Sequence, residues 1–369
     1  MIYLDSGATS FHKPPSVYRA VQDAMHSCAS PGRGGYGAAM EAARRVYGCR
    51  AVAAELFQCR PEQVVLTNSC THGLNIAIRS LVKPGDKVVV SGFEHNAVTR
   101  PLHALGAEII VAGRKLFDWE DTIRSFRKAL DAGADAAIFT HVSNVFGYIL
   151  PVGELAALCR QRKIPFIIDA AQSAGVLPIR FSDLGADFIA MPGHKGLLGP
   201  QGTGLLLCRD LAQPLMQGGT GSESLRQEMP DFLPDRLEAG TLNVPGFAGL
   251  AEGIRYVKRM GEERIFRREH AQLEACIRGL RKLGVQVFAG EHQAGTVSFL
   301  PGCDCEEAAE RLAKQGIAVR AGLHCAPFAH ESAGTLETGS VRVSFGHDAQ
   351  KSQTQALLRS VSKLLPYNK

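Results

Sequence analysis

The chain has 369 residues, 45% of them hydrophobic and 21% charged, a balance typical of a globular protein with more than one core. Its 41 basic and 36 acidic residues leave a net charge of only +5, so there is no reason to expect a nucleic-acid partner. No apolar run approaches the ~18 residues of a membrane span, and the start, MIYLDSGATS, does not read as a signal peptide. The ten cysteines include no CxxC pair, so we expect free thiols and a cytoplasmic location.

Short apolar runs alternate with helix-like stretches through the first two thirds of the chain. Helices are expected at 73–81, 118–130 and 153–162. Continuous apolar strands between helices favour an α/β fold with a mostly parallel, seven-stranded sheet covered on both faces. The expected strands are 64–66, 87–91, 108–112, 136–140, 166–169, 188–191 and 204–208.

The pattern changes near residue 247 and indicates a smaller α+β domain. We therefore expect a large domain over 1–246 and a small one over 247–369, with residues 1 to about 15 packing on the small domain. A long helix is expected from 247 to about 283. Its basic stretch, Arg264 to Arg268, is typical of a solvated helix face. Further strands are expected at 296–299, 318–320 and 341–344, and helices at 305–315 and 350–365.

A lysine stands on a glycine-rich turn directly after one predicted strand, in the sequence GHKG at 193–196. Ligands of parallel sheets bind beyond the carboxyl ends of the strands, so this position matters. A partly desolvated lysine loses its proton more readily and can form a Schiff base with an aldehyde. Lys195 is therefore a candidate to hold pyridoxal phosphate, although GHKG alone also fits an ordinary surface lysine.

Other strand ends carry side chains that suit the same cofactor. Asp169 would keep a pyridine nitrogen protonated, which makes the ring an electron sink, or it would only cap the next helix. Gln172 and Asn144 could reach the phenolic oxygen. Thr71 opens a helix whose amides suit a phosphate dianion. His95 would stack on the ring or move protons, or it is a core histidine.

Three stretches in order, DAAQSAG, GHKGLLGPQGTG and RAGLHCAP, resemble the class V aminotransferase family of pyridoxal phosphate enzymes. Within that family the chain resembles the group II (SUF-type) cysteine desulfurases and selenocysteine lyases. Matching stretches run from YLDSGATS to SVRVSFG, nearly the whole chain. The resemblance implies a fold type I homodimer with pyridoxal 5'-phosphate between a large and a small domain.

The resemblance also implies roles around the cofactor ring. Lys195 would be the Schiff-base lysine, and Asp169 would hold the pyridine nitrogen. Gln172 and Asn144 would hold the phenolic oxygen, with Asn144 also beside the substrate. His95, in FEHNA, would stack on the ring and take part in catalysis.

The phosphate and the substrate carboxylate have their own implied partners. Thr71 and His194 would hold the phosphate, and Thr241 would reach the phosphate of the neighbouring subunit. Arg320 and Arg342 would hold the carboxylate of L-cysteine, since a guanidinium fork matches that planar anion. Without the family, both arginines read as surface residues.

Two positions depart from the family pattern. Pro192 stands where relatives often carry a serine or threonine that binds phosphate, so one hydroxyl contact is missing. Tyr36 stands where many relatives carry a histidine near the substrate.

One cysteine is the expected nucleophile. A desulfurase needs a thiolate that takes sulfur from the substrate and becomes a persulfide, and Cys325 follows Arg320 by five residues and His324 directly. Nearby positive charge would help this thiol ionise. Relatives read HHC where this chain has Leu323 before His324 and Cys325. The short loop from Cys325 to Arg342 implies a sheltered cysteine and a separate sulfur-acceptor protein. We assign no role to the remaining cysteines, which include Cys303 and Cys305.

Several alternatives stay open. The chain could be an aminotransferase or β-lyase of the same family with Cys325 incidental, and selenocysteine lyase activity is closer still. A phosphate-binding loop at GLLGPQGTG lacks the required lysine and hydroxyl after its glycines. A metal site at His324, Cys325 and His330 matches no common zinc spacing, so we expect no metal.

Overall fold

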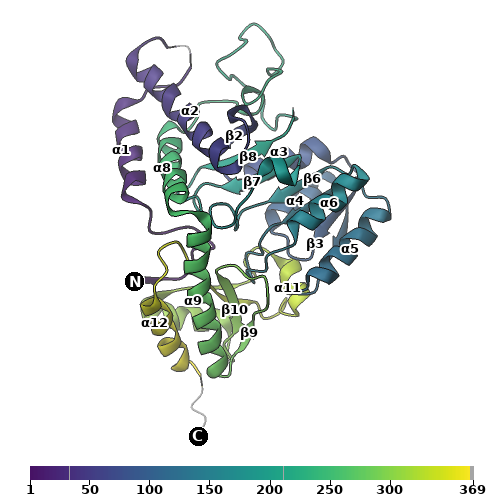
Figure 1. Cartoon of the computed structure of the whole chain (residues 1–369), viewed down its shortest axis with the longest axis vertical. Coiled ribbons are helices and arrows are strands. Elements are labelled where there is room, and N and C mark those ends of the chain that lie inside the picture. The colour runs from purple at the N-terminus through teal and green to yellow at the C-terminus, as the bar shows by residue number, and fades with distance from the viewer. Residues whose placement is uncertain (33, 211, 366–369) are drawn as a thin grey trace.

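The computed structural model describes residues 1–32, 34–210 and 212–365, and a larger and a smaller body make up the molecule (Figure 1). The larger body is built on a seven-stranded sheet with the order β2-β8-β7-β6-β5-β3-β4. In the described chain, β8 alone runs antiparallel to its neighbours in this sheet. The expected mostly parallel, seven-stranded sheet is therefore confirmed. The strands are β2 (Val64–Thr67), β3 (Lys87–Ser91), β4 (Glu108–Ala112), β5 (Ala136–Thr140), β6 (Phe166–Asp169), β7 (Phe188–Pro192) and β8 (Gly204–Cys208).

Helices cover both faces of this sheet, which explains why its central strands are apolar at successive positions. Along β5, Ala137 and Phe139 face one core, while Ala136 and Ile138 face the other. The first core includes residues of α2, α5, α6 and α8, and the second includes residues of α3 and α4. The helices of this body are α1 (Pro15–Ser27), α2 (Gly37–Phe57), α3 (Cys70–Leu81), α4 (Asn96–Leu105), α5 (Trp119–Asp131), α6 (Val152–Arg162), α7 (Phe181–Leu184) and α8 (Val244–Met260), with short 3₁₀ helices at Pro61–Gln63 and Asp235–Leu237.

The smaller body is an antiparallel four-stranded sheet with the order β12-β13-β10-β9, covered by helices. The chain's first strand, β1 (Ile2–Tyr3), pairs in parallel with β11 (Ile317–Ala318), and Leu4 belongs to this body's core. The N-terminus accordingly lies beside the small body in Figure 1. The elements are β9 (Gln286–Phe288), β10 (Thr296–Leu300), β12 (Arg320–Gly322), β13 (Ser340–Ser344), α9 (Glu262–Lys282), α10 (Cys305–Lys314), α11 (Pro327–Ala333) and α12 (Lys351–Ser362).

One helix and one strand that the sequence predicts after residue 246 are each interrupted in the structure. The single helix expected over 247–283 is two helices, α8 and α9, because Gly261 between them has a φ of 80° that no helix allows. Phe247 of α8 packs in the larger core and Leu273 of α9 in the smaller one. The strand expected over 318–320 is also split, because residue 318 ends β11 and residue 320 begins β12 in another sheet. No helix in the described part of the chain is long and apolar enough to span a membrane.

Candidate active site

A cavity of about 240 Å³ lies at the carboxyl ends of the parallel strands. Its walls come from the segments that follow β2, β3, β5, β6 and β7, far apart in sequence. The structure therefore brings together the residues expected to bind the cofactor within one subunit. They are Thr71, His95, Asn144, Asp169, Gln172, His194 and Lys195.

Lys195 lies on the turn after β7, enclosed by the walls of the cavity. This desolvation lowers the pKa of its amine below the ordinary value, which favours the neutral, nucleophilic form. The flanking glycines have a packing reason: a Cβ on Gly193 would collide with Thr203, and one on Gly196 would collide with the carbonyl oxygen of Ala174. The turn needs glycine because the backbone passes so close to its neighbours.

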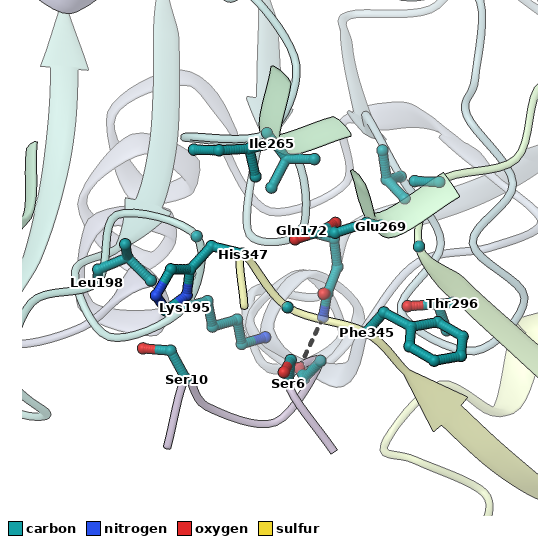
Figure 2. Close-up of a pocket in the computed structure, with 17 residues that line it drawn as sticks. Ser6, Ser10, Gln172, Lys195, Leu198, Ile265, Glu269, Thr296, Phe345 and His347 are labelled. Atoms are coloured by element: carbon teal, nitrogen blue, oxygen red, sulfur yellow. Dashed lines mark hydrogen bonds between the residues drawn. The ribbon is translucent and has the colours of Figure 1, made fainter. Parts of the chain in front are cut away.

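Lys195 also lines a second, smaller cavity of about 40 Å³ (Figure 2). Its lining includes Ser6, Gln172 and Glu269. The dashed bond in Figure 2 is the Gln172 amide donating to the carbonyl oxygen of Gly7 at 2.9 Å. One of the two amide hydrogens of Gln172 is thereby committed, which leaves the other for the expected phenolic oxygen.

Asp169 ends β6 inside the cavity and is only 2% exposed. Its Oδ1 accepts a hydrogen bond from the Ala171 amide at 2.9 Å and a second from the Cys70 thiol at 3.4 Å. Cys70 was not singled out from the sequence, although it stands directly before Thr71. Burial and the Asp169 carboxylate raise the pKa of the Cys70 thiol well above its ordinary value, so this thiol stays protonated.

His95 caps α4 and is fixed by that role. Its Nδ1 accepts from the Ala97 amide at 3.0 Å, which leaves Nε2 as the protonated nitrogen. Burial lowers the pKa of this imidazole, so it is neutral at pH 7 and suited to stacking on an aromatic ring. Asn144 donates its side-chain amide to the carbonyl oxygen of His324 at 2.8 Å, which ties it to the small body.

The start of α3 forms the end of the cavity where the phosphate is expected. Ser69 caps this helix by accepting from the His72 amide at 3.1 Å, and the first amides of a helix have no acceptor within it. His194 contacts the Thr9 hydroxyl at 3.0 Å, and burial lowers its pKa to about 4, so it would bind phosphate as a neutral donor.

Pro192 lines the cavity, as expected from its place in the sequence. Thr241 is exposed and lies outside this cavity, so its role toward a neighbouring subunit stays a prediction.

Two arginines expected to bind the substrate carboxylate lie opposite each other on β12 and β13. In this structure both contact Asp5: Arg342 Nη2 at 2.6 Å and Arg320 Nη2 at 2.9 Å. The cluster of two guanidiniums and one carboxylate keeps one net positive charge for a substrate anion. Asp5 was missed, because nothing in YLDSGATS indicates a partner 337 residues away.

Arg342 is the buried member of this pair. Its Nη1 donates to the carbonyl oxygen of Asn144 at 3.0 Å, and its Nε finds no partner among the described residues. Burial lowers the pKa of this guanidinium, an effect that the Asp5 carboxylate opposes. An unpaired buried donor beside a positive charge fits an incoming carboxylate.

Cys325 lies on the turn of residues 323–326, between β12 and α11. Its thiol lines a third cavity of about 400 Å³, together with Arg100. This cavity shares Thr71 and His95 with the cofactor cavity, so the two are adjoining spaces. The expectation of a sheltered cysteine is not met in the single chain, because Cys325 lines this outer cavity and is exposed.

Four buried thiols fit structural roles better. Burial raises the pKa of Cys49, Cys159, Cys208 and Cys276 to about 12. Among the described residues no group of three or more His, Cys, Asp or Glu side chains is arranged to hold a metal ion.

Comparisons with known proteins place this geometry in a family. The model of the family described as aminotransferase class-V matches residues 2–357. A probable cysteine desulfurase of Methanothermobacter thermautotrophicus is 31% identical over 98% of this chain and 94% of its own. Another, from Pyrococcus abyssi, is 30% identical over 88% and 85%. The apo structure of the cysteine desulfurase from Thermococcus onnurineus superposes with a TM-score of 0.88 at 31% identity, covering 98% of this chain and 94% of the other. The family resemblance drawn from the three sequence motifs is confirmed.

Proposed function

Because the chain belongs to the class V aminotransferase family, we propose that it is a pyridoxal-phosphate-dependent cysteine desulfurase. It would convert L-cysteine to L-alanine and pass the sulfur, as a persulfide on Cys325, to an acceptor. The observation that carries the proposal is the meeting of two features: the cavity of Lys195 and Asp169, and the exposed thiol of Cys325 on an adjoining cavity.

The residues of the cavity fit pyridoxal phosphate. When bound, this cofactor supplies an electron sink for bonds to the substrate's Cα. Lys195 would hold it covalently, and Asp169 would pair with the pyridine nitrogen, where a carboxylate keeps the proton in place. Neutral His95 would stack on the ring. The phosphate would lie at the start of α3, against Thr71 and His194.

Different side chains of the site would then bind L-cysteine, transfer its Cα proton and attack its sulfur. Arg342, with Arg320, would bind the substrate carboxylate and so orient the rest of the molecule. Lys195, with its lowered pKa, would move the proton at Cα. The Cys325 thiolate would attack the substrate's sulfur: a sulfur–sulfur bond forms, the substrate's carbon–sulfur bond breaks, and the carbon skeleton takes up protons to become alanine.

Two arginines bring positive charge toward the Cys325 thiol. Arg320 is near enough for the two groups to interact, since Cys325 is among the causes that raise the pKa of Arg320, after the larger effects of Asp5 and Tyr3. Arg100 lines the same outer cavity as the thiol. An exposed cysteine at a rim is also open to the thiol of a separate acceptor protein, which we propose receives the sulfur. The free thiols fit a cytoplasmic location.

We further propose that the enzyme is a homodimer. Large apolar side chains are exposed on α1 and α2, with Tyr18 at 56%, Met25 at 70% and Tyr47 at 59%. A largely apolar cleft of about 670 Å³ runs along α1, and apolar surface of this kind is typical of a contact site for another protein. In such a dimer, Thr241 could bind the cofactor phosphate held by the neighbouring subunit. Sedimentation should therefore show about twice the 39.6 kDa chain mass, and a monomer would contradict the dimer.

The test of function compares three forms of the protein with L-cysteine. Wild type should be yellow, should release alanine, and should carry one extra sulfur on Cys325 by mass spectrometry after a short pulse. Cys325→Ser should keep the colour and release almost no alanine, because a serine hydroxyl stays protonated at neutral pH. Lys195→Ala should lose the visible band that borohydride bleaches.

Other outcomes would identify the related activities. Conversion of L-cysteine to pyruvate or another keto acid instead of alanine, at the same rate in wild type and Cys325→Ser, would contradict the desulfurase and leave a β-lyase or an aminotransferase. Turnover of selenocysteine alone by wild type would identify a selenocysteine lyase, because selenium is the better leaving group.

A further inference from the structure

The turn that carries Cys325 has an unfavourable backbone conformation. His324 and Cys325 have φ values of 51° and 55°, so two consecutive residues other than glycine are left-handed. Such strain persists only where the surroundings impose it. Hydrogen bonds to the backbone of the turn supply part of this restraint. The side-chain amide of Asn144 donates to the carbonyl oxygen of His324 at 2.8 Å, and the backbone amide of Asn96 donates to the carbonyl oxygen of Cys325 at 2.7 Å.

A row of side chains behind the turn supplies the rest. The Thr335 hydroxyl lies 2.8 Å from His330 Nδ1. His330 Nε2 lies 3.4 Å from His324 Nδ1, with the two rings nearly parallel at 12°. His324 Nε2 lies 3.3 Å from the carbonyl oxygen of Arg320. The row therefore joins Thr335, two residues beyond the end of α11, to the residue directly before Cys325.

The chemistry of the groups fixes the direction of every bond in this row. A carbonyl oxygen only accepts, so His324 Nε2 carries the hydrogen and its Nδ1 is an acceptor. His330 Nε2 must then donate, which makes His330 Nδ1 the acceptor of the Thr335 hydroxyl. Both rings are neutral in this arrangement. Burial agrees with it, since it lowers the pKa of His324 to about 3 and that of His330 to about 4.

This arrangement rules out one role for His324. Its only acceptor nitrogen faces His330, so His324 cannot take the proton of the Cys325 thiol without breaking the row. His324 can, however, transmit a fixed orientation from the buried ring behind it. His330 is fully buried, and its ring centroid lies 5.8 Å from that of Phe146, so the surrounding residues restrict the movement of its ring.

We propose that His330 is a positioning residue for Cys325: held by Thr335, it orients His324 and so imposes the left-handed turn that keeps the thiol beside the cofactor cavity. The inference rests on the proposed function, in which Cys325 is the nucleophile. It adds His330 and Thr335, neither of which touches the substrate, to the groups on which sulfur transfer depends.

The experiment removes and restores the bonds of His330 in the holoenzyme. His330→Phe keeps a buried flat ring without hydrogen bonds, whereas His330→Gln keeps an amide donor toward His324 and an acceptor for Thr335. Ser332→Ala is the matched control, because its hydroxyl joins the same helix to the carbonyl oxygen of Gly92, away from the turn. Each variant is measured for kcat and KM with L-cysteine, for its visible cofactor band, and for the rate at which iodoacetamide alkylates Cys325 by mass spectrometry.

His330→Phe should keep the band and the KM but lose about 10- to 100-fold in kcat, the effect of a displaced reacting group. Its Cys325 should be alkylated several-fold more slowly, because the relaxed turn moves the thiol away from Arg320. His330→Gln and Ser332→Ala should stay near wild type. The proposal is overturned if His330→Phe matches wild type, or if His330→Gln is as impaired as His330→Phe, which would show a packing role only.

A second pair of variants applies if His330→Phe does not fold. Thr335→Val should lower kcat, and Thr335→Ser, which restores the hydroxyl donor, should recover it; full activity in Thr335→Val would overturn the proposal. Failure of the proposed function is separate. A wild-type protein that makes no alanine would refute the desulfurase, while the alkylation rates would still report how His330 holds Cys325.

Discussion

Asp5 changes what the two arginines of the site can do. The carboxylate of Asp5 contacts the guanidiniums of both Arg342 and Arg320, so a substrate carboxylate would share these two arginines with Asp5. The two differ in surroundings: the Arg342 side chain is 3% exposed and that of Arg320 is 52% exposed. Charged contacts are stronger where water is excluded, so Arg342 should contribute more to substrate binding than Arg320.

We predict that Arg342→Ala raises the KM for L-cysteine by about 30-fold or more, since losing one partner of a buried charged contact costs roughly 2–5 kcal/mol. Arg320→Ala is the control and should raise KM much less. Because Arg342→Ala also leaves Asp5 without its closest partner, the double variant with Asp5→Asn separates binding from misfolding. Steady-state kinetics with a check of the cofactor band measure both, and an unchanged KM in Arg342→Ala would remove this residue from the site.

Two thiols near the cavity of Lys195 lie in different environments, and this difference supports the proposal that Cys325 is the nucleophile. Cys70 lies inside the cavity and donates to Asp169, and its raised pKa keeps it protonated. Cys325 lies at the rim with Arg320 nearby. The pulse experiment with L-cysteine should therefore find sulfur on Cys325 and not on Cys70.

At the level of the elements, local patterns were enough for the larger sheet. Its central strands are short apolar runs buried by helices on both faces, and the polar residues after these runs mark the edge where ligands bind. That regularity is why seven residues proposed to bind the cofactor could be named from the sequence and then found in one cavity.

Features that depend on distant contacts could not be predicted. Asp5 meets Arg342 only because the first strand crosses to the small body. His330 reads as one more histidine on a short helix until the turn places His324 against it. Gly261 lies inside an otherwise helical pattern and did not predict a break, because a single glycine destabilises a helix by only about 1 kcal/mol. Its positive φ separates α8 and α9, which pack in different cores, and this could be seen only in the structure.

For the molecule as a whole, buried titratable groups set how stability depends on pH. Burial raises the pKa of Glu94 and Glu269 to about 8 and that of Glu262 to about 7. Burial lowers the pKa of His141 and His194 to about 4. The histidines favour the folded state above their unfolded pKa of about 6.5, and this contribution is lost as the pH falls toward 4.

The buried carboxyl groups act in the opposite sense. Between the unfolded pKa near 4.5 and the folded value near 8, the folded chain holds a proton that the unfolded chain has released. Stability therefore falls as the pH rises through this window, by about 1.4 kcal/mol per pH unit for each such proton. Above about pH 6.5 the neutral histidines no longer offset this loss, so the free energy of unfolding should decrease from pH 6.5 to pH 8.

Glu94 allows this argument to be tested at one site. It is fully buried, accepts hydrogen bonds from Ser91 and from the Thr140 amide, and has an Oε2 with no partner among the described residues. Glu94→Gln keeps the accepting oxygen and removes the titration, whereas Glu108→Gln, on the exposed start of β4, is the matched control. Thermal unfolding of the holoenzyme at several pH values measures the difference in Tm between each variant and wild type. This difference should shift in favour of Glu94→Gln as the pH rises from 6.5 to 8 and stay constant for Glu108→Gln. A constant difference for Glu94→Gln would mean that its carboxyl group is already ionised in the folded protein, and the decrease in stability would have to come from Glu269 and Glu262.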